Sequence, residues 1–133
     1  VLTPLVGEST GHVDMFATFT AANEVIVGEI LEGDHENAMV LDENAAQLAA
    51  LGMKVRRIPM PHHDDGLYRT YTNAMAINQI VIVPVYPEDD RYQDAALRVF
   101  ADAYPLRTII PIVASEIIER AGAVHCVGMT VAL

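Results

Sequence analysis

The fold is decided by two stretches with the same pattern, MFATFTAANEVIVGEI at residues 15–30 and YTNAMAINQIVIVPVY at residues 71–86. Each begins with strand-like residues and passes through a polar turn into a β-branched run, Val25–Val27 in the first and Val81–Val83 in the second. The turns fall at Ala22–Glu24 and at Asn78–Gln79. Two such runs around a short turn are typical of a β-hairpin, so the sequence predicts two hairpins 56 residues apart.

A helix and a further strand are expected after each hairpin. The first helix follows the acidic residues Asp34 and Glu36 and ends at Gly52, and the second ends before Pro105. The residues at helical spacing are Leu41, Ala45 and Leu48 in the first and Ala96, Phe100 and Ala103 in the second. Strands are predicted at residues 54–58 and 107–113, so a unit of strand, strand, helix, strand occurs twice.

The closing residues 124–133 are predicted to form the first strand of a third unit. The expected fold class is therefore α/β, with about two repeated units and one strand of a third in a single domain over residues 1–133. Units of this kind cover each other's faces. We therefore expect either a piece of a larger ring or self-association with another chain.

Composition limits the kinds of ligand and environment that the chain is expected to have. The net charge of −10 repels nucleic acid and attracts cationic ligands. Hydrophobic residues make up 52% of the chain, but the apolar runs are well short of the roughly 20 residues that span a bilayer, so no membrane segment is predicted. One cysteine allows no internal disulfide, and no CxxC metal-site spacing is present. These features assign no cellular compartment.

His12 and Asp14 stand at the entrance to the first hairpin. On a strand, residues two apart point to the same face, roughly 6–7 Å from each other, so this imidazole and carboxylate can share one pocket. The alternative is a solvent-facing polar pair at a strand entrance. The spacing alone leaves both interpretations open.

Cys126, the only cysteine, directly follows His125 in an apolar segment. If residues 124–131 are extended, the two side chains point to opposite faces, so His125 is not expected to serve as base for the thiol. One interpretation of Cys126 is a buried, inert residue. As a nucleophile near neutral pH it needs its pKa lowered from about 8.5 to about 7, which a nearby cation such as protonated His12 or a bound guanidinium supplies.

Further polar residues lie around the second hairpin. The run HHDD at residues 62–65 offers imidazole and carboxylate ligands for a metal, but its spacing favours a solvated loop of the kind that often borders sites. Asn73, at the mouth of the second hairpin, either orients a substrate or caps the turn. Tyr68, Arg69 and Tyr71 are candidates to line the same mouth.

Three segments, GHVD at residues 11–14, YTN at 71–73 and HC at 125–126, occur in this order, each at the first strand of a unit. With the hairpin NQIVIVPVY at residues 78–86, they resemble the guanidino-modifying enzymes of the pentein, or five-fold β/α-propeller, fold. The chain is most similar to the Porphyromonas-type peptidylarginine deiminases and their agmatine deiminase relatives. The resemblance covers about the C-terminal half of such an enzyme, which implies an incomplete propeller with a missing N-terminal half.

The resemblance implies four site residues: the nucleophile Cys126, the general acid/base His12, the guanidinium-binding Asp14 and the positioning residue Asn73. The implied substrate is a guanidino compound, either an arginine residue in a peptide or agmatine. A carboxylate forms a bidentate, charge-assisted pair with a planar guanidinium, and the attacking thiolate is stabilised by that cation. The implied reaction passes through a Cys-linked thiouronium, releases ammonia and leaves a ureido group, with no metal or organic cofactor.

The chain departs from this pattern in two respects. Such enzymes take further carboxylates from their first half, and agmatine-type enzymes carry a glycine run before the His-Cys pair, where this chain has Glu119–Ala123. With those carboxylates outside the chain, we expect the 133 residues alone to be a poor catalyst. Two alternatives remain, a non-catalytic guanidinium-binding module and a self-associating structural fragment.

Overall fold

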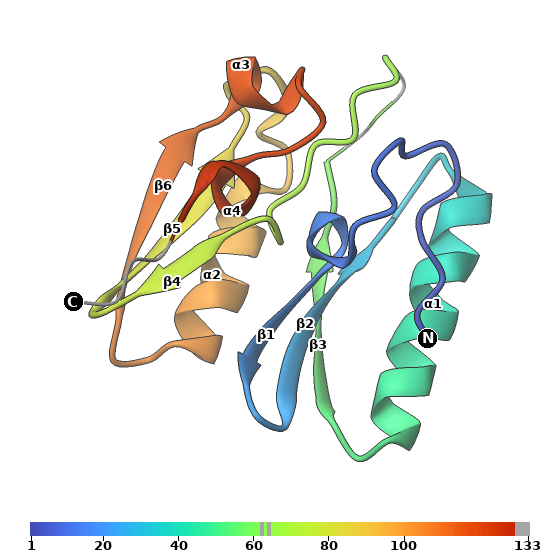
Figure 1. The fold of residues 1–133 in the computed structure, drawn as a ribbon, viewed down its shortest axis with the longest axis horizontal. Coiled ribbons are helices and arrows are strands. Elements are labelled where there is room, and N and C mark those ends of the chain that lie inside the picture. Colours follow the sequence, from blue (N-terminus) through green and yellow to red (C-terminus); the bar gives the residue numbers. More distant parts are fainter. Residues whose placement is uncertain (62, 64, 130–133) are drawn as a thin grey trace.

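The fold consists of two units of one design, drawn as two neighbouring three-stranded sheets in Figure 1. The computed structural model describes residues 1–61, 63 and 65–129. The first unit comprises β1 (Ala17–Ala21), β2 (Glu24–Glu29), α1 (His35–Ala50) and β3 (Lys54–Pro59). The second comprises β4 (Met75–Ile77), β5 (Ile80–Val85), α2 (Gln93–Ala103) and β6 (Thr108–Val113). The shorter helices of this part are η1 (Val13–Met15), η2 (Pro87–Asp89), α3 (Ser115–Ile118) and α4 (Val124–Val127).

Both sheets have the same strand order and the same pairing. In each, the first two strands form an antiparallel hairpin, and the second and third strands run parallel. A parallel pair needs a crossover connection, which α1 supplies in the first unit and α2 in the second. The two predicted hairpins and the α/β class are therefore confirmed. Asn78 in the second turn has φ 50°, a left-handed conformation that asparagine adopts more readily than most residues.

Local signals in the sequence set the ends of the two long helices. α1 begins after Asp34, whose carboxylate accepts a hydrogen bond from the backbone N–H of Asn37 at 3.0 Å. Gly52, at φ 84°, follows the last turn of α1, and α2 ends at Ala103, ahead of Pro105. Both predicted helices are confirmed. No helix in the described part of the chain is long and apolar enough to cross a membrane.

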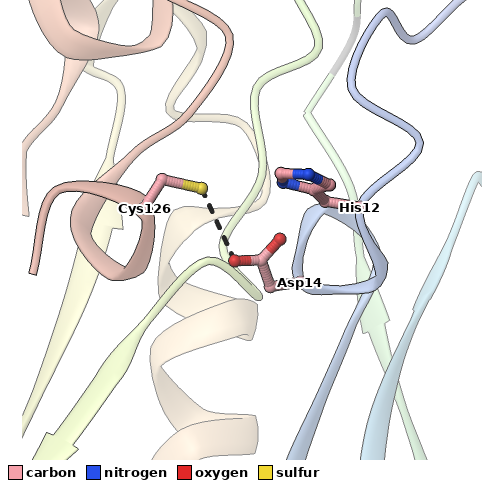
Figure 2. Close-up of side chains that lie close together, drawn as sticks. All are labelled: His12, Asp14 and Cys126. Atoms are coloured by element: carbon pink, nitrogen blue, oxygen red, sulfur yellow. Dashed lines mark hydrogen bonds between the residues drawn. The ribbon is translucent and has the colours of Figure 1, made fainter.

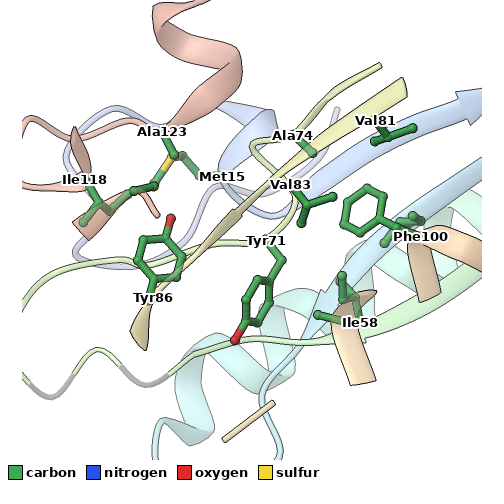
Figure 3. Packing of buried hydrophobic residues seen from close by; sticks show 13 residues of the cluster. Met15, Ile58, Tyr71, Ala74, Val81, Val83, Tyr86, Phe100, Ile118 and Ala123 are labelled. Atoms are coloured by element: carbon green, nitrogen blue, oxygen red, sulfur yellow. The ribbon is translucent and has the colours of Figure 1, made fainter. Parts of the chain in front are cut away.

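Two hydrophobic clusters form the core, and the second joins the units. Val25 and Val27 of β2 pack in the cluster beneath α1, whereas Ile26 points to the opposite face of the sheet. There Ile26 and Ile58 belong to a cluster that includes Phe100 of α2, and Figure 3 shows Ile58 beside Phe100. Because β2 is buried on both faces, the second unit is fixed against the outer face of the first.

The predicted strand of a third unit is wrong where the structure describes it. Val124–Val127 form the short helix α4, and residues 130–133 lie outside the described residues. The cause is Asn73, which accepts hydrogen bonds from the backbone N–H groups of Ala123, His125 and Cys126. These bonds curl the segment around one residue and occupy the N–H groups that a strand would offer to a neighbour.

Candidate active site

Three segments far apart in the sequence meet at one end of the two sheets: η1, the residues that precede β4, and α4 (Figure 1). In Figure 2 the sulfur of Cys126 and the imidazole of His12 face each other, with the carboxylate of Asp14 beneath the gap. The ligand atoms of these three side chains all lie within 4.8 Å of one another. The structure therefore brings three of the four predicted site residues around one point.

His12 and Asp14 reach this point by a route that the sequence did not predict. They do not lie on a strand: Val13–Met15 form the 3-10 turn η1, with His12 just before it. The turn is closed by hydrogen bonds from the backbone N–H of Met15 to the carbonyl of His12 at 3.2 Å and from Phe16 to Val13 at 3.1 Å. The expectation of a shared pocket is met, but its stated cause, the alternation of a strand, is wrong.

Asn73, the fourth predicted residue, lies fully buried behind Cys126. Its Oδ1 accepts the backbone N–H groups of Ala123 at 3.0 Å and Cys126 at 3.2 Å. Its Nδ2 donates to the sulfur of Cys126 at 3.0 Å, and its own carbonyl accepts the N–H of His125 at 3.0 Å. Asn73 therefore holds the segment of the thiol in place, and the interpretation as a turn cap is wrong.

Thr72, for which the sequence gives no functional prediction, connects the segments that lead into the two hairpins. Its hydroxyl donates to the backbone carbonyl of Asp14 at 3.0 Å and lies 2.8 Å from the hydroxyl of Thr70. Both threonines are buried. The available signal was the position of two hydroxyl residues directly before Asn73, in a stretch otherwise predicted to enter a strand.

His125 also belongs to the site, contrary to the expectation from an extended segment. Its Nδ1 lies 2.6 Å from Oδ2 of Asp14, and the thiol of Cys126 donates to the same oxygen at 3.5 Å. Because α4 is helical, neighbouring side chains diverge by much less than they would on a strand. His125 and Cys126 therefore both reach Asp14.

The second carboxylate oxygen of Asp14, Oδ1, is buried and has no hydrogen-bond partner among the described residues. Figure 2 shows this oxygen directed toward the gap between His12 and Cys126. A buried acceptor without a donor costs free energy, about 1–3 kcal/mol by mutational data. The site thus has a built-in place for a hydrogen-bond donor next to the thiol.

The surroundings of Cys126 raise the pKa of its thiol above the ordinary value. Burial has the largest effect, and the negative charge of Asp14 acts in the same direction, whereas the hydrogen bond from Asn73 opposes them. Gly122 leaves room for this sulfur, since a Cβ at that position would lie 2.7 Å from the Cβ of Cys126. In this structure the thiol is therefore held in place, and its surroundings favour the protonated form.

The remaining polar candidates that the structure describes do not join the site. His63 stacks on Tyr68 and bonds to Asp34 at 2.7 Å, and Asp65 pairs with Arg69, while residues 62 and 64 lie outside the described residues. The described members of the HHDD run therefore face different partners instead of one metal. Tyr71 is a fully buried core residue, so its placement at the mouth is wrong.

The comparisons with known proteins agree with each other. The sequence profile of the Porphyromonas-type peptidyl-arginine deiminase family matches residues 3–131. An agmatine deiminase of Stutzerimonas stutzeri strain A1501 is 23% identical over 148 aligned residues, covering 90% of this chain and 40% of that protein. The chain thus spans about two fifths of the length of this relative.

Solved structures show the same relationship in the backbone. C. jejuni agmatine deiminase matches with a TM-score of 0.82 at 24% identity, over 94% of this chain and 39% of its own. A cysteine-to-serine variant of that enzyme with substrate bound has a TM-score of 0.79 at 25% identity, over 90% of this chain and 37% of its own. Since the profile matches nearly the whole chain and the backbone follows these enzymes, the chain belongs to the Porphyromonas-type peptidyl-arginine deiminase family.

Proposed function

We propose that this chain forms the nucleophile-bearing part of a deiminase that converts a guanidino group to a ureido group. The observation that carries this proposal is the convergence of a thiol, an imidazole and a carboxylate from two segments more than 100 residues apart. Family membership supports it, because the relatives are named for reactions at arginine or agmatine. The substrate class is accordingly a guanidino compound, either an arginine residue in a peptide or agmatine.

Asp14 is the group that binds the guanidinium. Its Oδ1 faces the gap beside the thiol and lacks a donor among the described residues, and guanidinium N–H groups supply one. A planar guanidinium can engage both oxygens of a carboxylate, which also fixes its orientation relative to the sulfur. To use both oxygens the substrate displaces His125 and the thiol from Oδ2.

The chemistry proceeds in two halves at Cys126. The thiolate sulfur attacks the guanidino carbon, and the C=N electron pair moves to nitrogen to give a tetrahedral adduct. His12 then gives a proton to one amino group, the C–N bond breaks, and ammonia leaves a thiouronium on the sulfur. In the second half His12 takes a proton from water, the resulting hydroxide adds to the same carbon, and the C–S bond breaks to release the ureido product.

Substrate binding also prepares the nucleophile. Without substrate, burial and the charge of Asp14 raise the pKa of Cys126. A bound guanidinium neutralises Asp14 and places a positive charge next to the sulfur, so the thiolate becomes favourable when its target is present. The Asn73 amide donates to the sulfur throughout and stabilises the thiolate once it forms.

A longer protein is needed to complete the site. Within the cluster of described residues Asp14 supplies the only carboxylate, and the chain spans about two fifths of its relatives. We place residues 1–133 in a propeller domain whose other units supply further acids and a helix to cover the exposed face of β6. Sedimentation of the product of the whole reading frame tests this. A monomer is expected, whereas a dimer formed through β6 would mean that a second copy covers this face instead of a helix of the same chain.

Replacement of Cys126 tests the catalytic proposal. Product of the whole reading frame is incubated with agmatine, free arginine and an arginine peptide, and both ammonia and ureido product are measured. We expect Cys126→Ala to abolish turnover with each substrate and His35→Gln, on the far helix α1, to leave it unchanged. Turnover that survives Cys126→Ala would refute the nucleophile.

A guanidinium-binding module without turnover is the second candidate. It is favoured by the single carboxylate of the described cluster, which suffices to hold one edge of a guanidinium. Calorimetry with the arginine peptide separates the two. Binding that Asp14→Asn abolishes, together with no ammonia release from the unaltered protein, would support the module over the deiminase.

A further inference from the structure

We propose that His12, Asp14 and Cys126 also form a binding site for Zn²⁺, and that the bound ion blocks the thiol. The three side chains come from two separate segments and offer one nitrogen, one oxygen and one sulfur. Zn²⁺ accepts this combination, because thiolate, imidazole and carboxylate are its three usual protein ligands. Ca²⁺ and Mg²⁺ prefer oxygen ligands alone and are not expected to bind here.

The distances suit a tetrahedral ion. With Zn–S of about 2.3 Å and Zn–O of about 2.1 Å, the sulfur and oxygen of a tetrahedral site lie about 3.6 Å apart. The observed separation between Cys126 Sγ and Asp14 Oδ2 is 3.5 Å. All three ligand atoms lie within 4.8 Å of one another, so His12 needs a shift of about 1 Å to reach its ligand position.

The backbone is fixed while the outermost ligand is free to make this shift. Asn73 holds the backbone of Cys126, and η1 holds that of Asp14. His12 is exposed, and its ring can rotate toward the gap it faces in Figure 2. Three protein ligands leave the fourth position of the ion to water, as in known catalytic zinc sites.

The groups around the cluster also favour a cation. Asp14 Oδ1, the carboxylate oxygen beside the ligand atom Oδ2, is buried without a donor among the described residues, and the positive charge of a nearby cation stabilises it. His125, whose Nδ1 lies 2.6 Å from Asp14 Oδ2, orients this carboxylate as outer partners orient metal ligands elsewhere. Thiolate and carboxylate together carry two negative charges, which equal the charge of the ion.

The pair formed by His63 and Asp34 is a useful comparison, because it lacks features that the cluster of His12, Asp14 and Cys126 has. His63 bonds to Asp34 at 2.7 Å, but both oxygens of Asp34 are already used by Asn37 and His63, and no thiol lies nearby. This pair offers two candidate ligands that are bonded to each other. Zn²⁺ is therefore expected at Cys126 and not at His63.

Metal titration of the 133-residue chain tests the site without any substrate. Co²⁺ replaces Zn²⁺ as a spectroscopic probe, and a thiolate-to-cobalt absorption band reports ligation by Cys126, the only cysteine. We expect one ion per chain, displacement of Co²⁺ by Zn²⁺, and no displacement by Ca²⁺. Absence of the thiolate band at saturating Co²⁺ would overturn the proposal.

Variants locate the ion. Cys126→Ser, His12→Gln and Asp14→Asn are each expected to weaken Zn²⁺ binding by more than about 100-fold, and His125→Gln by roughly 10- to 100-fold. His35→Gln, on α1, is the matched control and should change nothing. Affinity that survives Cys126→Ser would place the metal elsewhere, as would loss of affinity in His63→Gln.

Inhibition rests on the proposed deiminase function and is measured separately. With product of the whole reading frame, Zn²⁺ is expected to inhibit turnover in competition with agmatine or the arginine peptide, and EDTA to restore it. Metal binding without any basal turnover would refute the deiminase but not the site. Turnover that is unaffected by saturating Zn²⁺ would refute the blocking role.

Discussion

The two units share a backbone plan but differ in what covers their outer face. The ladder of each parallel pair has the same register, so Ile58, opposite Gly28, corresponds to Ile112, opposite Pro84. Ile58 has no exposed surface, because α2 of the next unit packs over it, whereas Ile112 is 45% exposed. The comparison teaches that burial in this fold comes from the neighbouring unit as much as from a unit's own helix.

The units differ at their mouths as well. The first carries His12 and Asp14, for which we propose proton transfer and substrate binding, at the start of and within the turn η1. The second carries Asn73 and Thr72, which bond to the segments of Cys126 and Asp14. The repeat thus supplies the scaffold, and the proposed chemistry uses residues that differ between the copies at the line where they meet.

The largest expected effect is on kcat, and it distinguishes the proposed proton-transfer role of His12 from the positioning role of His125. In product of the whole reading frame, His12→Gln should lower kcat by roughly 10²- to 10⁴-fold, the range typical of a lost general acid/base. His125→Gln should lower it by less, because Asp14 keeps its place on η1. Steady-state kinetics on both variants checks this, and equal losses would show that proton transfer is not confined to the first mouth.

The exposed and covered isoleucines provide a matched pair for stability. Ile58→Ala should lower the free energy of unfolding by about 2–5 kcal/mol, since it opens a cavity between the units. Ile112→Ala in the same 133-residue chain should cost no more than about 0.5 kcal/mol, as is usual at the surface. Urea denaturation measures both. Similar costs would mean that the face of β6 is already covered, for example by self-association.

The helices of the two units differ in their first turn. Although burial acts to raise it, hydrogen bonds from Asn37 and His63 lower the pKa of Asp34 to about 2. The carboxylate therefore stabilises the fold above its unfolded pKa of about 4, and this contribution is lost as pH falls toward 2. Tyr92, the N-cap residue of α2, makes no side-chain hydrogen bond that caps the helix.

Asp34→Ala should accordingly cost about 0.5–2 kcal/mol at neutral pH and progressively less below pH 4. Asp94→Ala, in the first turn of α2, is the control and should cost less because Asp94 lies inside that turn and is not the N-cap residue. Denaturant melts across the acid range measure the difference. A cost that stays constant down to pH 2 would contradict the assigned role of the charge.

The smallest expected effect is on the pKa of Cys126, on which one residue from each unit acts in the opposite direction. Asp14 raises the pKa of Cys126 and Asn73 lowers it. The pH midpoint of alkylation by iodoacetamide should therefore move down in Asp14→Asn and up in Asn73→Ala. Shifts in the same direction would show that one of the two contacts does not act on the sulfur.

The repeat and its elements were predictable because their causes are local. Turn residues, the cap at Asp34 and the stop at Gly52 each act within a few positions, so hairpins and helices follow from the chain itself. The shapes of η1 and α4 were not predictable in this way. They are held by bonds from Asn73 and Thr72, 50 or more residues away, and no local pattern distinguishes such a segment from a strand.

The sequence predicted which side chains lie close together better than it predicted the backbone that brings them there. The order of the three segments pointed to His12, Asp14, Asn73 and Cys126, and all four lie together or bond to one another. An extended segment would turn His125 away from Cys126, and the only signal for Thr72 is its position, with Thr70, shortly before Asn73. Both are identified only when the backbone that bends around Asn73 is known.

Asn73 forms hydrogen bonds with Cys126, 53 residues later in the chain, and this separation has a consequence for biosynthesis. As the polypeptide leaves the ribosome, η1 and the first sheet can form while the nucleophile is still unsynthesised. The sulfur then gains its amide donor and its carboxylate neighbour in a single late event, when α4 closes on the finished second hairpin. A nascent chain that still lacks α4 therefore carries no assembled cluster of thiol, imidazole and carboxylate.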